Sequence, residues 1–255
     1  MIKIKNNRNK GYLFHYAHFL CDCLFPEISS NIFRFKKVIR KKNIRQTIGN
    51  FSNFYTEVMT TENIELPEKQ FNQLKIHMIT YKKKEDYCNK KYFDKFRQFI
   101  FLRYKINNLE YNSNYPEVLL IKRNERVELL NDKCLQKLNN NISTGKERRE
   151  IHNIDIVDTY LKEKYNDKYK SVYFENIPFK EQVLYFNNAK MIICAHGAVM
   201  SNMFFCKEKT KIIEVTCNTN WPFFDKISSI LILNHIKCIN NNCYKVIECI
   251  ENNTI

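Results

Sequence analysis

Glycine is scarce in this chain of 255 residues, which contains only four. They are Gly11, Gly49, Gly145 and Gly197, and they lie too far apart to form a Gly-x-Gly-x-x-Gly turn or a Walker-type phosphate loop. The sequence therefore excludes the standard dinucleotide-binding enzymes and the P-loop NTPases.

Cysteine pairs with zinc spacing and long apolar runs are also missing. The ten cysteines form no two Cys-x-x-Cys units, so a structural zinc site is not expected. No apolar run approaches the roughly 18 residues of a transmembrane helix. The apolar stretch Tyr12–Phe25 resembles a secretory signal only superficially, because His15, His18 and Asp22 interrupt it and no small-residue cleavage site follows. We therefore expect a soluble, cytoplasmic protein whose thiols are mostly reduced.

The composition is that of a folded, basic protein. Hydrophobic residues make up 44% and aromatic residues 14%, which provides enough apolar surface to offset the entropy lost on folding. The net charge of +15 lies mainly in residues 1–113, which carry 22 Lys and Arg against 10 Asp and Glu, whereas residues 114–255 carry 20 against 17. The densest basic run, Arg34–Arg45, fits either an anionic partner such as nucleic acid or a solvated face, and charge runs are more often solvated faces.

Strands and helices alternate in the second half of the sequence. Continuous apolar runs predict strands, and apolar residues at helical spacing predict helices between them. The expected strands are 118–121, 171–174, 191–195 and 211–215, and the expected helices are 154–164, 179–188 and 198–205. Strands that are apolar throughout belong to parallel sheets covered on both faces. The order therefore predicts a Rossmann-like α/β domain with its ligand at the carboxyl ends of the strands.

The first half is expected to form a separate domain that is rather helical. Tyr12–Phe25 and Phe93–Tyr104 have the spacing of helices, and a polar, Asn-rich stretch around Asn107–Pro116 precedes the first predicted strand. We therefore predict two domains, residues 1–113 and residues 114–255. Residues 126–147 contain consecutive asparagines and Gly145, and they are expected to form an inserted loop.

The turn after the strand 191–195 is the sharpest candidate for an anion-binding site. It reads Ala195-His196-Gly197-Ala198, so one of the four glycines lies between a buried strand and a helix. A helix start offers free backbone N–H groups and a positive dipole end, which together bind phosphate. The alternative is a structural turn in which Gly197 only permits the bend and His196 caps the helix. The residues alone leave both interpretations open.

Arginine side chains form a second candidate. Arg123 follows the first predicted strand, and Arg148 and Arg149 precede the next predicted helix. The planar guanidinium suits bidentate contact with phosphate. In a parallel sheet, Arg123 would lie at the same edge as His196, so the two could converge on one diphosphate. In a protein with 42 basic residues, an ordinary surface position is the alternative for these arginines.

A histidine and an aspartate in the first half form a third candidate. His18 and Asp22 are four residues apart, so on an α-helix they share a face and can form a hydrogen bond. Such pairs are either general bases or ordinary helix-surface contacts. Their apolar neighbours, among them Phe19 and Leu24, favour a functional pair, because an unpaired ionisable group among apolar residues is costly.

These motifs occur in a defined order along the chain. They are His18-Phe19-x-x-Asp22, Ile121-Lys122-Arg123, Arg148-Arg149-x-Ile151-x-Asn153, Glu181-Gln182, His196-Gly197-Ala198-x-x-x-Asn202 and Ile213-Glu214-Val215. The arrangement resembles glycosyltransferase family 61, which includes plant xylosyltransferases and animal O-linked N-acetylglucosamine transferases. The resemblance covers about residues 12–27 and 117–216, and its most specific part is the His-Gly-Ala-x-x-x-Asn element with its flanking strand and the later Ile-Glu-Val.

The resemblance implies a GT-B architecture, in which two Rossmann-like domains face a cleft, the N-terminal one being reduced in this short chain. It also implies an inverting, metal-independent glycosyltransferase that moves a sugar from a nucleotide donor, with a UDP-sugar as the expected donor and no bound cofactor. The lack of an Asp-x-Asp motif agrees with stabilisation of the leaving group by arginine and helix-start N–H groups.

The resemblance also implies roles for individual residues. The diphosphate would be contacted by Arg123 and by Arg148 or Arg149, and the donor loop would consist of His196, Gly197, Ala198 and Asn202. Glu214 would bind the ribose hydroxyls, and Gln182 would support that pocket. Asp22 would be the catalytic base and His18 its partner, with the reverse assignment left open.

The expected partners are a nucleotide sugar and a glycan or glycoconjugate acceptor. Because the excess positive charge lies in the half that would receive the acceptor, an anionic acceptor is expected if that charge has a role. Two alternatives remain at this stage. One is a basic nucleic-acid-binding protein, and the other is an inactive family member that binds a nucleotide sugar or glycan without transferring it.

Overall fold

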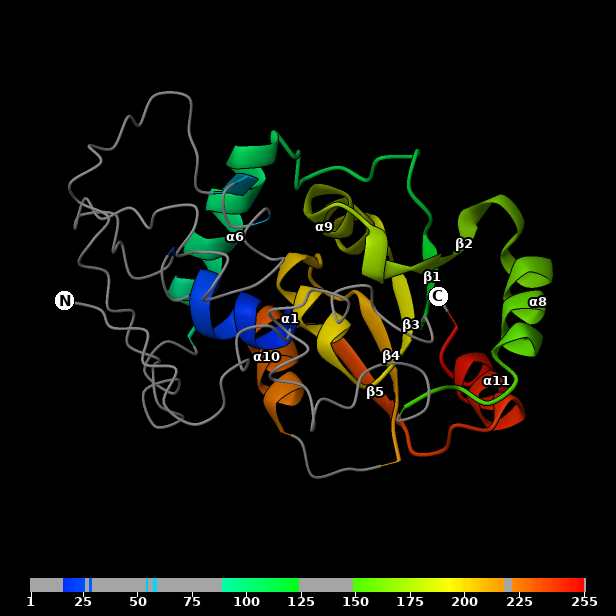
Figure 1. Cartoon of the computed structure of the whole chain (residues 1–255). Helices are drawn as coiled ribbons and strands as arrows, with labels where there is room; N and C mark the ends of the chain where they lie inside the picture. Colours follow the sequence, from blue (N-terminus) through cyan, green and yellow to red (C-terminus); the bar gives the residue numbers. More distant parts are fainter. Residues whose placement is uncertain are drawn as a thin grey trace, which may run out of the picture. The chain divides into compact units, whose positions relative to one another are not determined.

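The computed structural model describes residues 16–25, 28, 54, 57, 58, 89–123, 149–217 and 222–254 (Figure 1). Along these residues the chain divides into two compact units, and the division falls between Lys105 and Ile106. The predicted loop insertion at 126–147 and the basic run Arg34–Arg45 lie outside the described residues. No helix within the described ranges is long and apolar enough to span a membrane.

The N-terminal helix of the first unit changes its hydrogen-bond pattern part-way along. An α-helical turn, α1 (Tyr16–His18), continues directly into a π-helix, η2 (Phe19–Leu24). A π-helix has hydrogen bonds between residues five apart, whereas an α-helix has them between residues four apart. The sequence therefore predicted a helix here correctly, but the expectation of one regular α-helix was wrong for residues 19–24.

Helix α6 (Lys90–Tyr104) is the longest element of the first unit among the described residues. It begins three residues before the predicted helix 93–104, because the side chain of Asn89 accepts a hydrogen bond from the N–H of Tyr92 at 3.2 Å and caps the start. Phe93 and Phe96 of α6 pack edge-on against Phe25, with ring centroids 5.1 and 5.4 Å apart. These rings join the two helical segments of the unit.

The second unit is built on a five-stranded parallel sheet, which confirms the predicted α/β class. The strands are β1 (Val118–Lys122), β2 (Tyr169–Tyr173), β3 (Met191–Ala195), β4 (Lys211–Val215) and β5 (Asn234–Cys238). Their order across the sheet is β2-β1-β3-β4-β5, and all four neighbouring pairs are parallel. All residues of β1 and β3 are buried, as expected for central strands covered on both faces.

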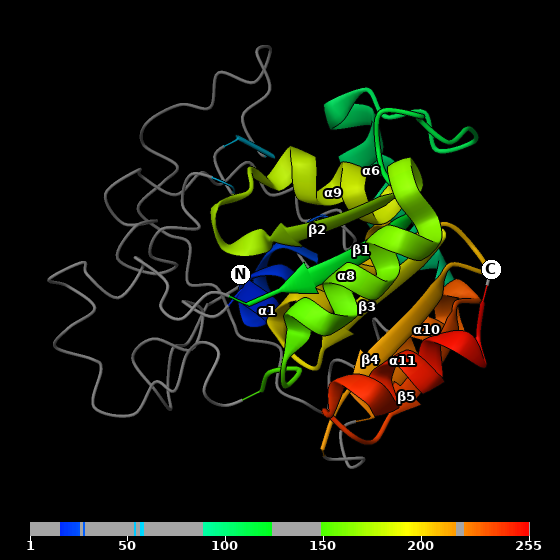
Figure 2. The same cartoon turned by 90° about the vertical axis from the view of Figure 1, so that its right-hand side faces the viewer.

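Helices cover both faces of this sheet (Figures 1 and 2). Helices α8 (Ile154–Tyr165) and α11 (Cys243–Glu251) lie on one face. The opposite face carries α9 (Phe179–Asn188), the 3-10 helix η10 (Ala198–Phe205) and α10 (Phe223–Leu231). Two short 3-10 turns, η8 (Asn166–Lys168) and η9 (Phe174–Asn176), flank β2. The arrangement is a doubly wound, Rossmann-like fold.

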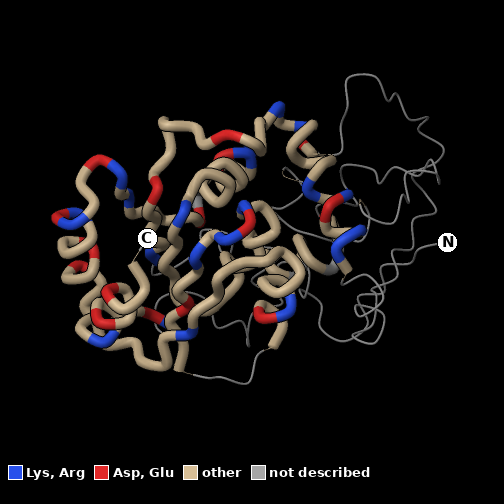
Figure 3. Tube along the Cα trace, turned by 180° about the vertical axis from the view of Figure 1, so that it is seen from behind, with Lys and Arg blue, Asp and Glu red and all other residues tan. Residues whose placement is uncertain are grey.

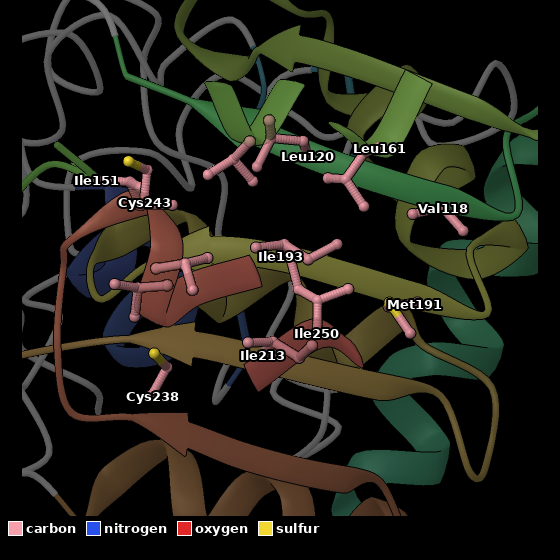
Figure 4. Packing of buried hydrophobic residues seen from close by; sticks show 13 residues of the cluster. Val118, Leu120, Ile151, Leu161, Met191, Ile193, Ile213, Cys238, Cys243 and Ile250 are labelled. Carbon is pink, nitrogen blue, oxygen red and sulfur yellow. The ribbon is translucent and has the colours of Figure 1, made fainter. Parts of the chain in front are cut away.

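The core between the sheet and the α8/α11 face consists of alternate strand residues (Figure 4). Val118, Leu120, Ile193 and Ile213 point to this side and pack with residues of both helices, including Leu161. Since side chains alternate along a strand, the intervening residues point to the α9/η10/α10 face. Glu214 is one of them, because its neighbours Ile213 and Val215 both belong to the α8/α11 core.

The predicted elements of the second unit agree with the structure most closely in the central strands. The predicted bounds of β3, β4, α9 and η10 are those observed, although η10 is a 3-10 helix. The strand predicted at 171–174 is wrong in its bounds, since β2 spans 169–173 and Phe174 already belongs to a 3-10 turn. Elements α10, β5 and α11 were not predicted. For β5 the reason is that it is an edge strand in which polar and apolar residues alternate and most residues are only half-buried.

Candidate functional site

The strand order creates a switch point between β1 and β3. From β1 the chain passes to β2 on one side, and from β2 it crosses to β3 on the other side. In doubly wound sheets, ligands bind beyond the carboxyl ends of the two strands where the order reverses. Arg123 directly follows β1 and His196 directly follows β3, and the strands are in register with Ile121 opposite Cys194. The sequence-predicted residues Arg123 and His196 therefore lie side by side at the switch point.

Arg123 is bound to the backbone of the turn after β3. Its guanidinium Nη2 donates a hydrogen bond to the carbonyl oxygen of His196 at 2.7 Å. A Cβ atom added to Gly197 would lie only 1.7 Å from Nη2 of Arg123. Gly197 also has a φ of 158°, a backbone angle that residues other than glycine rarely adopt. Gly197 thus makes room for the guanidinium, in addition to forming the turn.

The turn continues into η10, and Gly197 occupies the N-cap position of this helix. The alternative in which His196 caps the helix is therefore wrong. The first hydrogen bond of the helix runs from the N–H of Met200 to the carbonyl of Gly197 at 3.0 Å. Helix starts leave the preceding N–H groups, here those of Ala198 and Val199, without intrahelical partners. Both residues are half-buried, and N–H groups at a helix start are suited to binding an anion.

The side chain of His196 belongs to a network of ion pairs and hydrogen bonds that we call the histidine cluster, which consists of His196, Glu214, Asp225, His235 and Lys237. Glu214 lies between two imidazoles, with one carboxylate oxygen bound to Nδ1 of His196 and the other 2.7 Å from Nε2 of His235. Asp225 of α10 continues the network, 3.2 Å from Nδ1 of His235 and 2.6 Å from Nζ of Lys237. The cluster thus connects the turn after β3 with β4, β5 and α10.

Glu214 is charged despite its burial. Its side chain is 2% exposed. Burial raises the pKa of such a carboxyl, but the hydrogen bonds and charges of His196 and His235 outweigh burial and lower the pKa of Glu214 to about 2. The resemblance implied that Glu214 binds ribose hydroxyls. In the structure both of its oxygens are bound to imidazoles, so the position of Glu214 suits the support of His196.

Gln182 and Asn202 connect two helices behind the turn. The amide of Asn202 donates to Oε1 of Gln182 at 3.1 Å, and the amide of Gln182 donates to the carbonyl of Ile177 at 2.8 Å. Both side chains are almost completely buried. Asn202 therefore fixes η10 against α9, and its membership of the donor loop stays a prediction.

The remaining predicted site residues are described only in part. Arg149 is half-buried and lies just before Asn153, the N-cap residue of α8, whereas Arg148 lies outside the described residues. His18 ends α1 and Asp22 lies in the π-helix η2, but their side chains are not among those described.

A second ionic group, which we call the lysine cluster, lies at the end of β1: Lys122, Asp155, Asp158, Tyr169 and Ser171. Lys122 forms ion pairs with Asp158 and, at 3.0 Å, with Asp155 of α8. Asp158 also accepts hydrogen bonds from the hydroxyls of Tyr169, at 2.6 Å, and Ser171, at 3.1 Å. Lys122 was part of a sequence motif, but its role as an anchor between β1 and α8 was not predicted.

His235 and Asp225 are the residues of this site that sequence reasoning missed. His235 lies 21 positions after Glu214, and only the parallel pairing of β4 with β5 brings the two together. The one available signal was a histidine in a short segment of alternating character, Asn-His-Ile-Lys-Cys, and that signal is weak.

Comparison with known proteins shows the family of this chain. The family model of glycosyltransferase 61 matches residues 16–213, which is most of the chain and includes Arg123 and the His196-Gly197 turn. No curated protein matches the sequence. The residues that surround His196 in the histidine cluster, from Glu214 onward, lie beyond the end of the family match. On the extent of that match, the chain belongs to glycosyltransferase family 61.

Proposed function

We propose that the protein is an inverting glycosyltransferase that transfers a sugar from a nucleotide donor, a UDP-sugar, to a hydroxyl of a glycan or glycoconjugate. The observation that carries this proposal is the contact of Arg123 with the His196 carbonyl over Gly197. This contact places a guanidinium beside a helix start, at the switch point of the sheet in a family 61 chain.

The donor diphosphate would bind at this turn. Arg123 has a planar fork of N–H donors, of which Nη2 is used by the His196 carbonyl. A guanidinium suits bidentate contact with a phosphate, and the N–H groups of Ala198 and Val199 add donors at the positive end of η10. Arg148 or Arg149 would supply a second guanidinium from the segment before α8.

These fixed donors would also stabilise the leaving group. When the bond between the sugar and the diphosphate breaks, negative charge develops on the departing phosphate oxygen. Preorganised N–H donors and a guanidinium lower the energy of that charge without a divalent cation. We therefore propose a metal-independent reaction, as the resemblance implied.

In the proposed mechanism, Asp22 accepts the proton of the acceptor hydroxyl and His18 supports it. Inversion requires the acceptor oxygen to attack the anomeric carbon on the face opposite the diphosphate, so the base must act from that face. The architecture proposed for this reaction is GT-B, with the acceptor bound by residues 1–113 and the donor by residues 114–255. The positive charge of the first half favours an anionic acceptor.

Calorimetric titration with UDP tests the donor half of the proposal. We expect UDP to bind the wild-type protein and to bind Arg123→Ala at least tenfold more weakly, since a charge-assisted contact is lost. Lys162→Ala is the matched control, because it removes one exposed positive charge of α8 at the opposite end of that helix from Asn153. Absence of UDP binding to the wild type, or equal binding by Arg123→Ala, would contradict the proposal.

A transfer assay separates an active enzyme from an inactive binding protein. The wild type and Asp22→Asn are incubated with nucleotide sugars and a panel of neutral and anionic glycans, and the anomeric configuration of any product is read by NMR. We expect an inverted product from the wild type and none from Asp22→Asn, with UDP binding by the variant intact. Intact donor after prolonged incubation with every acceptor would favour the inactive family member instead.

A further inference from the structure

The histidine cluster contains a histidine that has no place in the family motifs. The side chain of His235 is 5% exposed, and it comes from β5, at the edge of the sheet. Its two ring nitrogens face two different carboxylates, Glu214 at Nε2 and Asp225 at Nδ1. The imidazole therefore bridges a buried carboxylate and one that is partly exposed, with 46% of the Asp225 side chain accessible.

The acceptors around His235 favour a proton on each of its ring nitrogens. A carboxylate with a lowered pKa only accepts hydrogen bonds, and this holds for Glu214. At the other nitrogen, Asp225 Oδ1 lies 3.2 Å away and Ser228 Oγ 3.4 Å away. The Ser228 hydroxyl donates its proton to the Asp225 backbone carbonyl at 2.8 Å, so its oxygen faces His235 as an acceptor. With acceptors on both sides, His235 would be an imidazolium.

The charges around His235 balance this assignment. The groups that face it among the described residues are Glu214 from β4 and Asp225 and Ser228 from α10, while Lys237 of its own strand pairs with Asp225. Two carboxylates are thus matched by the imidazolium and the Lys237 ammonium. The two side chains of Glu214 and His235 are buried, and buried charges need this pairing.

We propose that His235 is a positioning residue of the donor site. As an imidazolium it holds one oxygen of Glu214, so that the other oxygen fixes His196 with its proton on Nδ1. Any second proton on His196 then resides on Nε2, the nitrogen turned away from Glu214. The imidazole that follows β3 is thereby held in one orientation and one tautomer at the switch point. The link to donor binding rests on the proposed function.

In this arrangement α10 and β5 support the turn after β3, although β5 lies two strands away from β3 in the sheet. Phe224 of α10 packs edge-on against the His196 ring, with centroids 5.4 Å apart, and Asp225 follows it in the sequence. The same helix therefore fixes the ring of His196 on one side and, through Asp225 and His235, the carboxylate that binds its Nδ1. All of these supporting residues lie beyond residue 213, where the family match ends.

Histidine-selective ¹⁵N NMR tests the proposal without any ligand. At pH 7 we expect His235 to show two protonated ring nitrogens and His196 to show a proton on Nδ1. In His235→Gln the ¹⁵N chemical shifts of the His196 ring nitrogens should become the average of the two neutral tautomers. Asp225→Asn is the milder variant, because it retains the size of a partly exposed side chain, and it should leave His235 with a single proton, on Nε2. His152→Gln, at an exposed histidine outside the cluster, should change neither residue.

UDP titration of the same proteins provides the functional readout. We expect His235→Gln to weaken UDP binding about tenfold and to alter its dependence on pH between 5 and 8, whereas His152→Gln retains both. A neutral His235 in the wild type, or an unchanged His196 signal and UDP affinity in both cluster variants, would overturn the proposal. If the wild type shows the expected protonation pattern but binds no UDP, the proposed donor is wrong and the positioning of His196 by His235 stands.

Discussion

The two ionic clusters of the second unit lie on opposite faces of one sheet, one beside the edge strand β2 and the other beside the edge strand β5. The lysine cluster joins β1 and β2 to α8, and the histidine cluster joins β4 and β5 to α10. Each places a buried ionisable side chain at a strand end, Lys122 in one and Glu214 in the other. They differ in the side chains that make them up and in the parts of the unit that they connect.

The lysine cluster keeps its charges throughout the neutral range. Burial lowers the pKa of Lys122, but its hydrogen bonds to Asp158 and Asp155 outweigh burial and raise it, and the pKa of Asp158 is lowered by the same contacts. The residues of the lysine cluster other than Lys122 all belong to β2 and α8. The histidine cluster contains two imidazoles, and it reaches the turn that holds Arg123. We infer that one cluster serves folding and the other serves the site.

Replacing the lysine is expected to have the largest effect on stability. Lys122→Met leaves Asp158 without its cation, and breaking a buried pair costs about 3 kcal/mol or more in the free energy of unfolding. Urea denaturation measures this loss, and Lys162→Met, on an exposed lysine of α8, should stay within about 0.5 kcal/mol of the wild type. The folded variant should retain its UDP affinity, and a large loss of affinity would show that the lysine cluster also serves the site.

Glu214→Gln is expected to change how stability depends on pH. The pKa of Glu214 is lowered from 4.5 to about 2 in the folded protein, so its charge stabilises the fold above pH 4.5 and this contribution is lost as the pH falls towards 2. Between pH 5 and pH 2 the wild type should lose about 3 kcal/mol more than the variant. Parallel curves of unfolding free energy against pH for the two proteins would contradict this.

Gly197→Ala tests whether Arg123 depends on the turn. The new Cβ would displace the guanidinium from the His196 carbonyl, so UDP binding should weaken about tenfold, as for loss of a charged hydrogen bond. The double variant with Arg123→Ala should bind no more weakly than Arg123→Ala alone, since both changes remove the same contact. Additive losses in this cycle would show that Gly197 acts independently of Arg123.

Tyr169→Phe should have the smallest effect of the four. It removes one hydrogen bond to Asp158 and leaves the ion pair with Lys122 in place, so we expect a loss of about 1 kcal/mol in the free energy of unfolding. The loss should be the same at pH 6 and pH 8, because no group of the lysine cluster titrates in that range. A loss that varies with pH there would remove the distinction between the clusters.

The central strands and the turn after β3 could be predicted from local sequence. β3 and β4 are continuous apolar runs, and the rare Gly197 follows β3 at a strand end, so periodicity and composition were sufficient. The edge strand β5 could not be predicted, because it is short and its polar residues alternate with apolar ones, without a continuous apolar run. The π-helical turn at Phe19–Leu24 was also missed, since apolar spacing does not distinguish it from an α-helix.

Acidic and basic residues are interspersed along the described part of the second unit, in agreement with its small net charge (Figure 3). The sequence by itself determined this balance, the parallel α/β class and the two residues, Arg123 and His196, that meet at the switch point. The tertiary structure alone decided what holds them, because hydrogen bonds between strands are set by register and not by distance along the chain. Thus Glu214 meets His235 only where β4 pairs with β5, and Gly197 meets Arg123 only where β1 pairs with β3.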